Sequence, residues 1–184
     1  MFVYQNRIQY PINIKKKDLK MAKYLLTQYG GPNGEIGAAL RYFNQRYTMP
    51  DNRGRSLLTD IACEELGHVE MISLMVHQLL KDATPEELAN AGMGSQYVEH
   101  ALAPFPTDSN GVPFKADFVT TGDPLADLSE DMAAEEKARA TYEHLMEMTN
   151  DPDVIGPLTF LRGREIVHFA RFKELYEIYK KEGY

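Results

Sequence analysis

The sequence has almost no cysteine, no long apolar run and no concentration of positive charge. Cys63 is its only cysteine, which excludes an intrachain disulfide and favours a reducing, intracellular setting. No apolar stretch approaches the roughly 18 residues of a membrane-spanning helix. The N-terminal stretch MFVYQNRIQYP lacks the apolar core of a secretory signal. We therefore expect neither secretion by a signal peptide nor a membrane partner.

The charge of the chain excludes a further class of partners. Asp and Glu number 27 against 20 Lys and Arg, and the net charge is −7. Because no basic patch is present to meet phosphates, nucleic acid is not an expected partner. The densest basic run, Lys15–Lys17, is too short for a polybasic membrane signal. The length of 184 residues predicts one domain over residues 1–184, with a substantial core.

Apolar periodicity predicts four main helices, preceded by an extended N-terminal arm over residues 1–14. The first helix is expected in two pieces, 18–28 and 33–47, because the turn sequence GGPNG interrupts it. The other three are expected over residues 53–81, 125–149 and 157–181.

A long crossover, residues 82–124, separates the second helix from the third. Its prolines and glycines forbid a long helix, so we expect a short helix at 85–91, a strand pair flanking Asn110-Gly111 and otherwise irregular chain. Such a connection lets the third helix start at the opposite end of the bundle, so the predicted fold is an all-α, ferritin-like four-helix bundle. Apolar residues of the arm and the crossover are expected to cover the bundle or a neighbouring subunit: Phe2, Val3, Tyr4, Phe105, Phe114 and Phe118.

Two helices break their own apolar stripe with a glutamate and a histidine. In the second helix the stripe is interrupted by Glu65 and His68, and in the fourth, one hundred residues later, by Glu165 and His168. Residues three apart lie on one face of a helix, so each Glu-x-x-His pair converges on one point. A single Glu-x-x-His motif is most often a pair of solvent-exposed residues. Two such motifs, each on an apolar stripe, instead indicate a shared functional site.

Each pair is preceded by a further glutamate and a tyrosine. Glu35 lies thirty residues before Glu65, and Glu135 lies thirty residues before Glu165. A tyrosine follows each of these upstream glutamates by seven residues, at Tyr42 and Tyr142. The chain therefore resembles two helix hairpins of one design. The tyrosines are candidates for hydrogen bonds to ligating carboxylates, although they could also be simple core aromatics.

Four carboxylates on dry helix faces would be prohibitively costly without partners. Four carboxylates and two neutral histidines around two divalent cations balance in charge, and helix bundles use this ligand set for dinuclear sites. The pattern thus predicts a two-metal site. Oxygen-rich coordination without thiolate suits manganese or iron, and a dry pair of such metals suits two-electron chemistry on O₂ or peroxide.

Neighbouring residues compete for the ligand positions. Glu64 lies one turn from His68, but its counterpart in the repeat is Arg164, which cannot bind a metal. Glu136 points away from the face of Glu135. Glu64, Glu70 and Glu136 are therefore expected to be second-sphere or solvent groups. His77, His100 and His144 show no partner pattern and are expected to be ordinary polar residues.

Four blocks of the sequence, GGPNGEIGAALRYFNQRYTMP, DIACEELGHVEMI, FVTTGDPLADL and FLRGREIVHFARF, resemble the manganese catalases, most closely the short spore-coat type. The resemblance extends over nearly the whole chain. It implies a ferritin-like bundle that holds two manganese ions and converts hydrogen peroxide to water and O₂. It also implies a location in the cytoplasm or the spore coat, with other spore-coat proteins as partners. The apolar residues of the arm and the crossover, and not the resemblance, predict a homo-oligomer.

Carried over residue by residue, the family's metal ligands fall on Glu35, Glu65, His68, Glu135 and His168. In such proteins one carboxylate bridges the two metals, at the position of Glu35, Glu65 or Glu135. Glu165 then stays beside the metals as the catalytic acid and base. Some relatives have an arginine before the third-helix glutamate, where this chain has Ala134.

Two other functions use the same residues. A di-iron oxidase or ferroxidase would need the same ligands, and a structural coat protein could carry the site as a vestige. The presence of all six site residues favours a working site.

Overall fold

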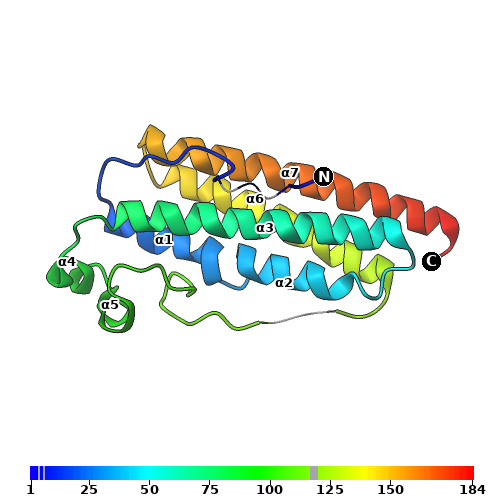
Figure 1. Cartoon of the computed structure of the whole chain (residues 1–184), viewed down its shortest axis with the longest axis horizontal. Coiled ribbons are helices and arrows are strands. Elements are labelled where there is room, and N and C mark those ends of the chain that lie inside the picture. Colours follow the sequence, from blue (N-terminus) through cyan, green and yellow to red (C-terminus); the bar gives the residue numbers. More distant parts are fainter. Residues whose placement is uncertain (4, 6, 117–119) are drawn as a thin grey trace.

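The computed structural model describes residues 1–184 except 4, 6 and 117–119, and the regular elements among them are all helices (Figure 1). Two consecutive helices pack along a long third one, and the last two helices pack along each other. These are α1 (Leu19–Gly30) and α2 (Glu35–Gln45) on α3 (Asn52–Leu79), and α6 (Pro124–Glu147) on α7 (Pro152–Glu182). Contacts of α3 with α7 and of α1 with α6 close the bundle. The predicted four-helix bundle, with its first helix in two pieces, is confirmed.

The crossover between α3 and α6 contains α4 (Pro85–Asn90) and α5 (Gly94–His100). The predicted short helix is α4, which begins with a reciprocal capping box between Thr84 and Glu87. The sequence pattern did not predict α5. The predicted strand pair is wrong, because the described part of this segment forms only one isolated antiparallel bridge, Thr107 to Pro113. Prolines at 104, 106 and 113 remove the N–H donors that a ladder would need.

The fourth bundle helix begins earlier than predicted. We expected its start at Pro157, but α7 begins at Pro152, with Asp151 as its N-cap, and Pro157 lies inside the helix. The Asp151 carboxylate accepts a hydrogen bond from the Asp153 N–H at 3.0 Å. A cap followed by proline at the first helical position is a strong start signal, and it overrides the second proline one turn later.

The crossover passes close to the end of α1. A Cβ atom on Gly30 would lie 2.5 Å from the carbonyl carbon of Pro106, so only glycine permits this approach. Further along, Phe114 lies 3.9 Å from the position of a Cβ on Gly37 of α2. The crossover therefore covers the edge formed by α1 and α2, where Figure 1 shows it in green.

The described residues of the N-terminal arm pack on α3 and α7. The Ile14 N–H donates to Gln78 of α3 at 2.7 Å, and the Gln78 amide donates to the Ile12 carbonyl at 3.2 Å. The rings of Tyr10 and Phe160 lie 5.4 Å apart. Of the apolar residues expected to cover the bundle, Phe2, Phe105 and Phe114 are half-buried and Val3 is exposed. Tyr4 and Phe118 lie outside the described residues.

Two apolar clusters fill the bundle, one at each end. The first joins α1 to the later half of α3, the end of α6 and the start of α7, and the second joins α2 to the first half of α3 and the end of α7. Along α3, residues 58–62 belong to one cluster and residues 71–80 to the other. The chain between them, with Glu65 and His68, forms a buried polar layer across the middle of the bundle.

Candidate metal centre

Three bundle helices and the start of α2 supply six buried polar side chains to this layer. Glu35 is the first residue of α2, Glu135 comes from α6, and α3 and α7 each supply a Glu-x-x-His pair. All six are at most 2% exposed: Glu35, Glu65, His68, Glu135, Glu165 and His168. The structure therefore brings together every residue that the sequence predicts for the site.

Donor atoms of these residues form two overlapping groups. Glu35 and His68 belong to one group and Glu135 and His168 to the other, and Glu65 and Glu165 belong to both. In each group one donor atom per residue lies within 4.8 Å of the others. Two groups that share two carboxylates have the arrangement that a pair of neighbouring cations requires.

Glu65 lies between the two imidazoles. One of its oxygens is 2.7 Å from Nδ1 of His68, and the other is 2.9 Å from Nδ1 of His168. Despite these short distances, none of these four atoms has a hydrogen-bond partner among the described residues. Buried polar atoms are rarely left without partners. Oxygen and nitrogen atoms that approach so closely without a hydrogen bond fit lone pairs directed at a cation, so the residues present fit a metal pair.

In the metal-free protein this cluster has to retain protons. Burial and the Glu65 charge raise the pKa of Glu35 to about 7, against the opposing effect of His68. Burial raises the pKa of Glu165 well above its usual range, and the charges of Glu35, Glu65 and Glu135 raise it further. A divalent cation would replace these protons and favour the ionised carboxylates.

The histidines show the complementary shift. Burial alone would lower the pKa of His68, but the charge of Glu65 and the contact with Glu35 outweigh it and raise the pKa to about 9. The pKa of His168 is likewise raised, because Glu65 and Glu135 outweigh burial. Without metal, imidazolium groups therefore supply part of the positive charge that the carboxylates require.

The two tyrosines cross between the hairpins. The Tyr42 hydroxyl of α2 donates to Glu135 of α6 at 2.5 Å, and the Tyr142 hydroxyl of α6 donates to Glu35 of α2. Both hydroxyls are fully buried, and burial followed by the charge of these carboxylates raises their pKa values well above 10.0. Each tyrosine thus remains a neutral donor that orients one oxygen of its carboxylate.

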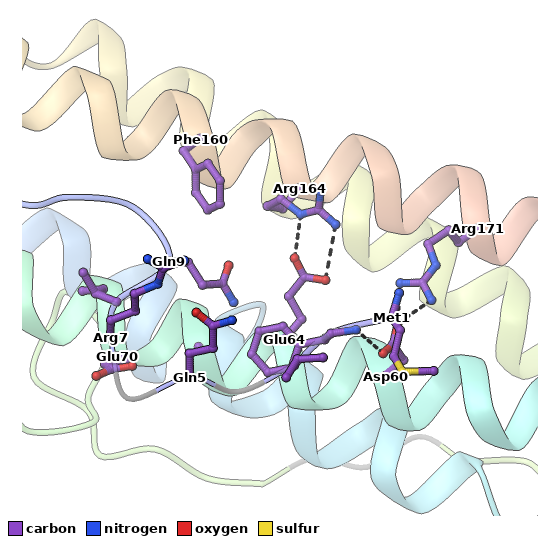
Figure 2. Close-up of a pocket in the computed structure, with 14 residues that line it drawn as sticks. Met1, Gln5, Arg7, Gln9, Asp60, Glu64, Glu70, Phe160, Arg164 and Arg171 are labelled. Carbon is purple, nitrogen blue, oxygen red and sulfur yellow. Dashed lines mark hydrogen bonds and ion pairs between the residues drawn. The ribbon is translucent and has the colours of Figure 1, made fainter.

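Glu64 contacts the outer nitrogens of both histidines. Its oxygens lie 3.1 Å from Nε2 of His168 and 3.9 Å from Nε2 of His68. Arg164 donates two hydrogen bonds to the same carboxylate, at 2.6 and 3.3 Å, as Figure 2 shows. Burial would raise the pKa of Glu64, but His168 and Arg164 lower it to about 2, so it stays ionised. Neither Nε2 atom has a hydrogen-bond partner among the described residues. The charge of the nearby carboxylate still favours a proton on Nε2 of His168, which leaves Nδ1 of that ring free to bind a metal.

The sequence analysis excluded Glu64 as a ligand but did not find this contact. The signal that could have revealed it is the repeat itself. Positions 64 and 164 are equivalent, and one holds an acid and the other a base. Both positions directly precede a site glutamate, and the repeat brings the two site glutamates to one centre, so opposite charges at 64 and 164 predict an ion pair.

One buried carboxylate near the site was missed altogether. Asp131 of α6, one turn before Glu135, is fully buried, and neither oxygen has a hydrogen-bond partner among the described residues. Burial raises its pKa well above the ordinary value. The remaining candidates lie outside both donor groups: Glu70, His77, Glu136, His100 and His144. Of these, Glu136 is exposed and pairs with Arg139, and His100 stacks on Phe105.

Comparison with known proteins identifies the family. The family described as "Manganese containing catalase" matches residues 1–183 of the chain. This protein belongs to the manganese catalase family. Among the helices that the structure describes, none is long and apolar enough to cross a membrane.

Relatives of this catalase family member cover nearly all of its length. It is 55% identical over 183 residues to Protein CotJC of Bacillus subtilis (strain 168). This alignment covers 99% of this chain and 96% of that protein. It is 34% identical to a probable manganese catalase of Clostridium acetobutylicum, over 94% of this chain and 77% of that one. A crystal structure of KatB, a manganese catalase from Anabaena, superimposes with a TM-score of 0.87 at 31% identity. That match covers 98% of this chain and 82% of KatB, and it confirms the ferritin-like fold.

Proposed function

We propose that this protein is a manganese catalase that binds two manganese ions and converts hydrogen peroxide to water and O₂. The observation that carries the proposal is the position of Glu65, whose two oxygens each face the Nδ1 atom of a different histidine without a hydrogen bond. Family membership supports manganese as the metal. Four carboxylates with four negative charges balance two divalent cations with four positive charges, so the buried layer becomes neutral on loading.

The donor groups support a proposed role for each ligand. Glu35 and His68 would hold one ion, Glu135 and His168 the other, and Glu65 would bridge the two, because each of its oxygens faces one histidine. The oxygen and nitrogen donors fit manganese and also iron, whereas a site for a softer metal would contain thiolates. When bound, the manganese pair supplies the two-electron redox change that the disproportionation of peroxide requires.

Glu165 is the proposed catalytic acid and base. Disproportionation requires protons to leave one peroxide molecule and to reach the oxygens of another. Glu165 belongs to both donor groups, and Oε1 of its carboxylate has no hydrogen-bond partner among the described residues. A carboxylate in this position, beside the metals and with a free oxygen, can accept a proton and release it. Tyr42 and Tyr142 would keep Glu135 and Glu35 oriented while this proton moves.

Metal analysis together with oxygen measurement tests the proposal. We expect about two manganese ions per chain, as in dinuclear bundle sites, and O₂ release when peroxide is added. Iron with O₂ consumption would instead support the di-iron oxidase. An empty site without O₂ release would support a structural protein, a possibility that the similarity to Protein CotJC keeps open, because that name states no activity.

Assembly and location are further proposals. A homo-oligomer is supported by exposed apolar side chains on several helices, among them Leu66, Ile166 and Val167. A monomer in light scattering at micromolar concentration would reject it. Location in the cytoplasm or the spore coat, with coat proteins as partners, rests on the resemblance of the sequence. Fractionation of cells and spores would test it.

A further inference from the structure

A small pocket reaches the carboxylate side of the metal centre between α2 and α6. It has a volume of about 10 Å³, which is room for about one water-sized molecule. Glu35, Glu135 and Glu165 line its inner end. One oxygen of Glu135 and one of Glu165 are buried without a hydrogen-bond partner among the described residues, so the pocket ends at unsatisfied acceptors.

Small side chains keep the walls of this inner pocket apart. Ala38 of α2 and Ala134 of α6 line it, and both are half-buried rather than fully covered. A longer side chain at either position would fill a space that holds about one water. The walls thus set a size limit close to that of hydrogen peroxide.

A larger pocket of about 400 Å³ lies outside the inner one. The turn after α1 and the crossover form it, with Asp108, Pro113 and Phe114 on the crossover side. The two pockets share Pro32, Asn33 and Arg41. The shared wall residues place the wide outer pocket next to the narrow inner one, and we refer to the two together as the funnel. Figure 1 shows the crossover, which supplies wall residues of the outer pocket, running along α2.

Arg41 lies where the two pockets meet. It is 9% exposed, and its Nε–H has no hydrogen-bond acceptor among the described residues. Its nearest ion-pair partner, Glu130, is 3.9 Å from Nη1. A buried guanidinium with an unused donor is unusual, and a passing polar molecule or anion would satisfy it.

The pocket in Figure 2 offers a competing route on the opposite side. Its volume is about 350 Å³, and it lies between the N-terminal arm and the α3–α7 surface. However, none of the six residues of the metal centre lines it. Glu64 and Arg164 line it instead, and their ion pair lies between this pocket and Nε2 of His168, which is 3.1 Å from Glu64.

We propose that hydrogen peroxide reaches the metal centre through the funnel between α2 and α6, with Ala38, Arg41 and Ala134 as its neck. The Arg41 guanidinium donates a hydrogen bond to the entering molecule, and the two alanines restrict entry to very small molecules. The molecule then arrives beside Glu165, the group proposed to exchange its protons. This inference rests on the proposed function for the identity of the substrate, but not for the route.

Azide binding to the manganese-loaded protein tests the route without relying on turnover. Azide is a small anion that binds such metals, and with the bound manganese oxidised to Mn(III) its association is followed by the change in visible absorption. Ala134→Leu and Ala38→Leu narrow the neck from opposite walls, and Arg41→Leu removes the donor. We expect each to slow azide association at least about tenfold, which is about 1.4 kcal/mol on the barrier, while manganese content stays unchanged. In the same variants kcat/KM for peroxide should fall.

Two control variants complete the experiment. Glu70→Trp fills the wall of the Figure 2 pocket from the exposed side of α3, and Arg55→Leu removes an exposed arginine elsewhere. Both should leave azide association unchanged. The proposal is overturned if the neck variants bind azide at the parental rate, or if Glu70→Trp is the variant that slows it. Loss of manganese in all three neck variants would also overturn it, because these residues would then support the ligands rather than a passage.

The results separate the route from the function. Slow azide binding in the neck variants of a protein that releases no O₂ would support the funnel and reject the catalase. Normal azide binding in variants of a protein that does release O₂ would support the catalase and reject the funnel.

Discussion

Glu64 and Arg164 occupy equivalent positions in the two hairpins, yet they carry opposite charges and bind each other across the bundle. At the scale of single residues, the repeat is thus symmetric where metals are expected and asymmetric beside them. The symmetric residues supply donor atoms, and the asymmetric pair places a carboxylate 3.1 Å from Nε2 of His168.

Glu165→Gln should leave manganese content near normal and lower turnover on the order of 10²-fold or more, the usual effect of removing a positioned acid–base group. The amide keeps the shape of the side chain but cannot transfer the proton. Metal analysis and oxygen release on the same sample check both parts. As the matched control, His168→Ala should lose manganese first and activity as a consequence. If Glu165→Gln removes the manganese, Glu165 is a ligand and another group carries the proton.

Glu64→Gln should weaken manganese binding by about 10- to 100-fold, the range found for groups that orient metal-bound histidines. The amide carries no negative charge, so the preference for a proton on Nε2 of His168, 3.1 Å away, becomes weaker. Titration with manganese in the presence of a competing chelator measures the affinity. Glu70→Gln, on the same helix but outside both donor groups, is the control. An unchanged affinity in Glu64→Gln would show that the ligands alone orient the histidines.

At the scale of the elements, the sequence predicted what periodicity and repeats encode. The four bundle helices, the first of them in two pieces, follow from apolar stripes and from GGPNG, and the six buried site residues follow from the offset of one hundred. The start of α7 was placed too late because Pro157 masked the cap at Asp151. Helix α5 was missed because its sequence, GSQYVEH, is short and has no buried residue that would mark an apolar stripe. Its N-cap residue, Met93, also has no side-chain acceptor for a capping hydrogen bond.

The contacts that depend on three-dimensional proximity could not be predicted. The pairing of each tyrosine with a carboxylate of the other hairpin requires knowledge of which helices are neighbours. The burial of Asp131 depends on α2 covering that turn of α6, and its position next to Glu135 on the helix gives no sign of it. Local patterns thus define helices and ligand sets, whereas partners across the bundle come only with the packed structure.

Asp51→Ala should lower the stability of the fold by about 1 kcal/mol, and the melting temperature by about 2–4 °C. The Asp51 carboxylate caps α3 through the Arg53 N–H at 2.8 Å and the Gly54 N–H at 3.4 Å. It also accepts from Tyr179 of α7 at 2.9 Å, so it joins the start of one helix to the end of another. Thermal unfolding measures the change. Asp51→Asn keeps the capping oxygen and should stay near the parent, and an equal loss in both variants would refute the capping role.

At the scale of the whole molecule, the polar layer couples stability to metal and to pH. In the metal-free protein the pKa of His68 is raised from 6.5 to about 9, because the charges of Glu65 and Glu35 outweigh burial. This group therefore stabilises the fold below pH 6.5, and the gain is lost as pH rises through 9. The pKa of Glu35 is raised from 4.5 to about 7, mainly by burial, so its contribution is lost between pH 4.5 and 7.

Folding raises the pKa values of both His68 and Glu35. The melting temperature of the metal-free protein should therefore fall as pH rises from 5 to 9. The manganese-loaded protein should melt well above it, and the gap should widen with pH, because metal binding displaces the retained protons. Calorimetry of chelator-treated and loaded samples across this range provides the measurement. Equal melting temperatures at every pH would mean that no metal occupies the buried layer.

The most direct test of the dinuclear centre is anomalous diffraction at the manganese absorption edge from crystals of the manganese-loaded protein. We predict two anomalous peaks in the buried layer, one beside Nδ1 of His68 and one beside Nδ1 of His168, with Glu65 between them. A single peak, or none at these histidines, would contradict the account.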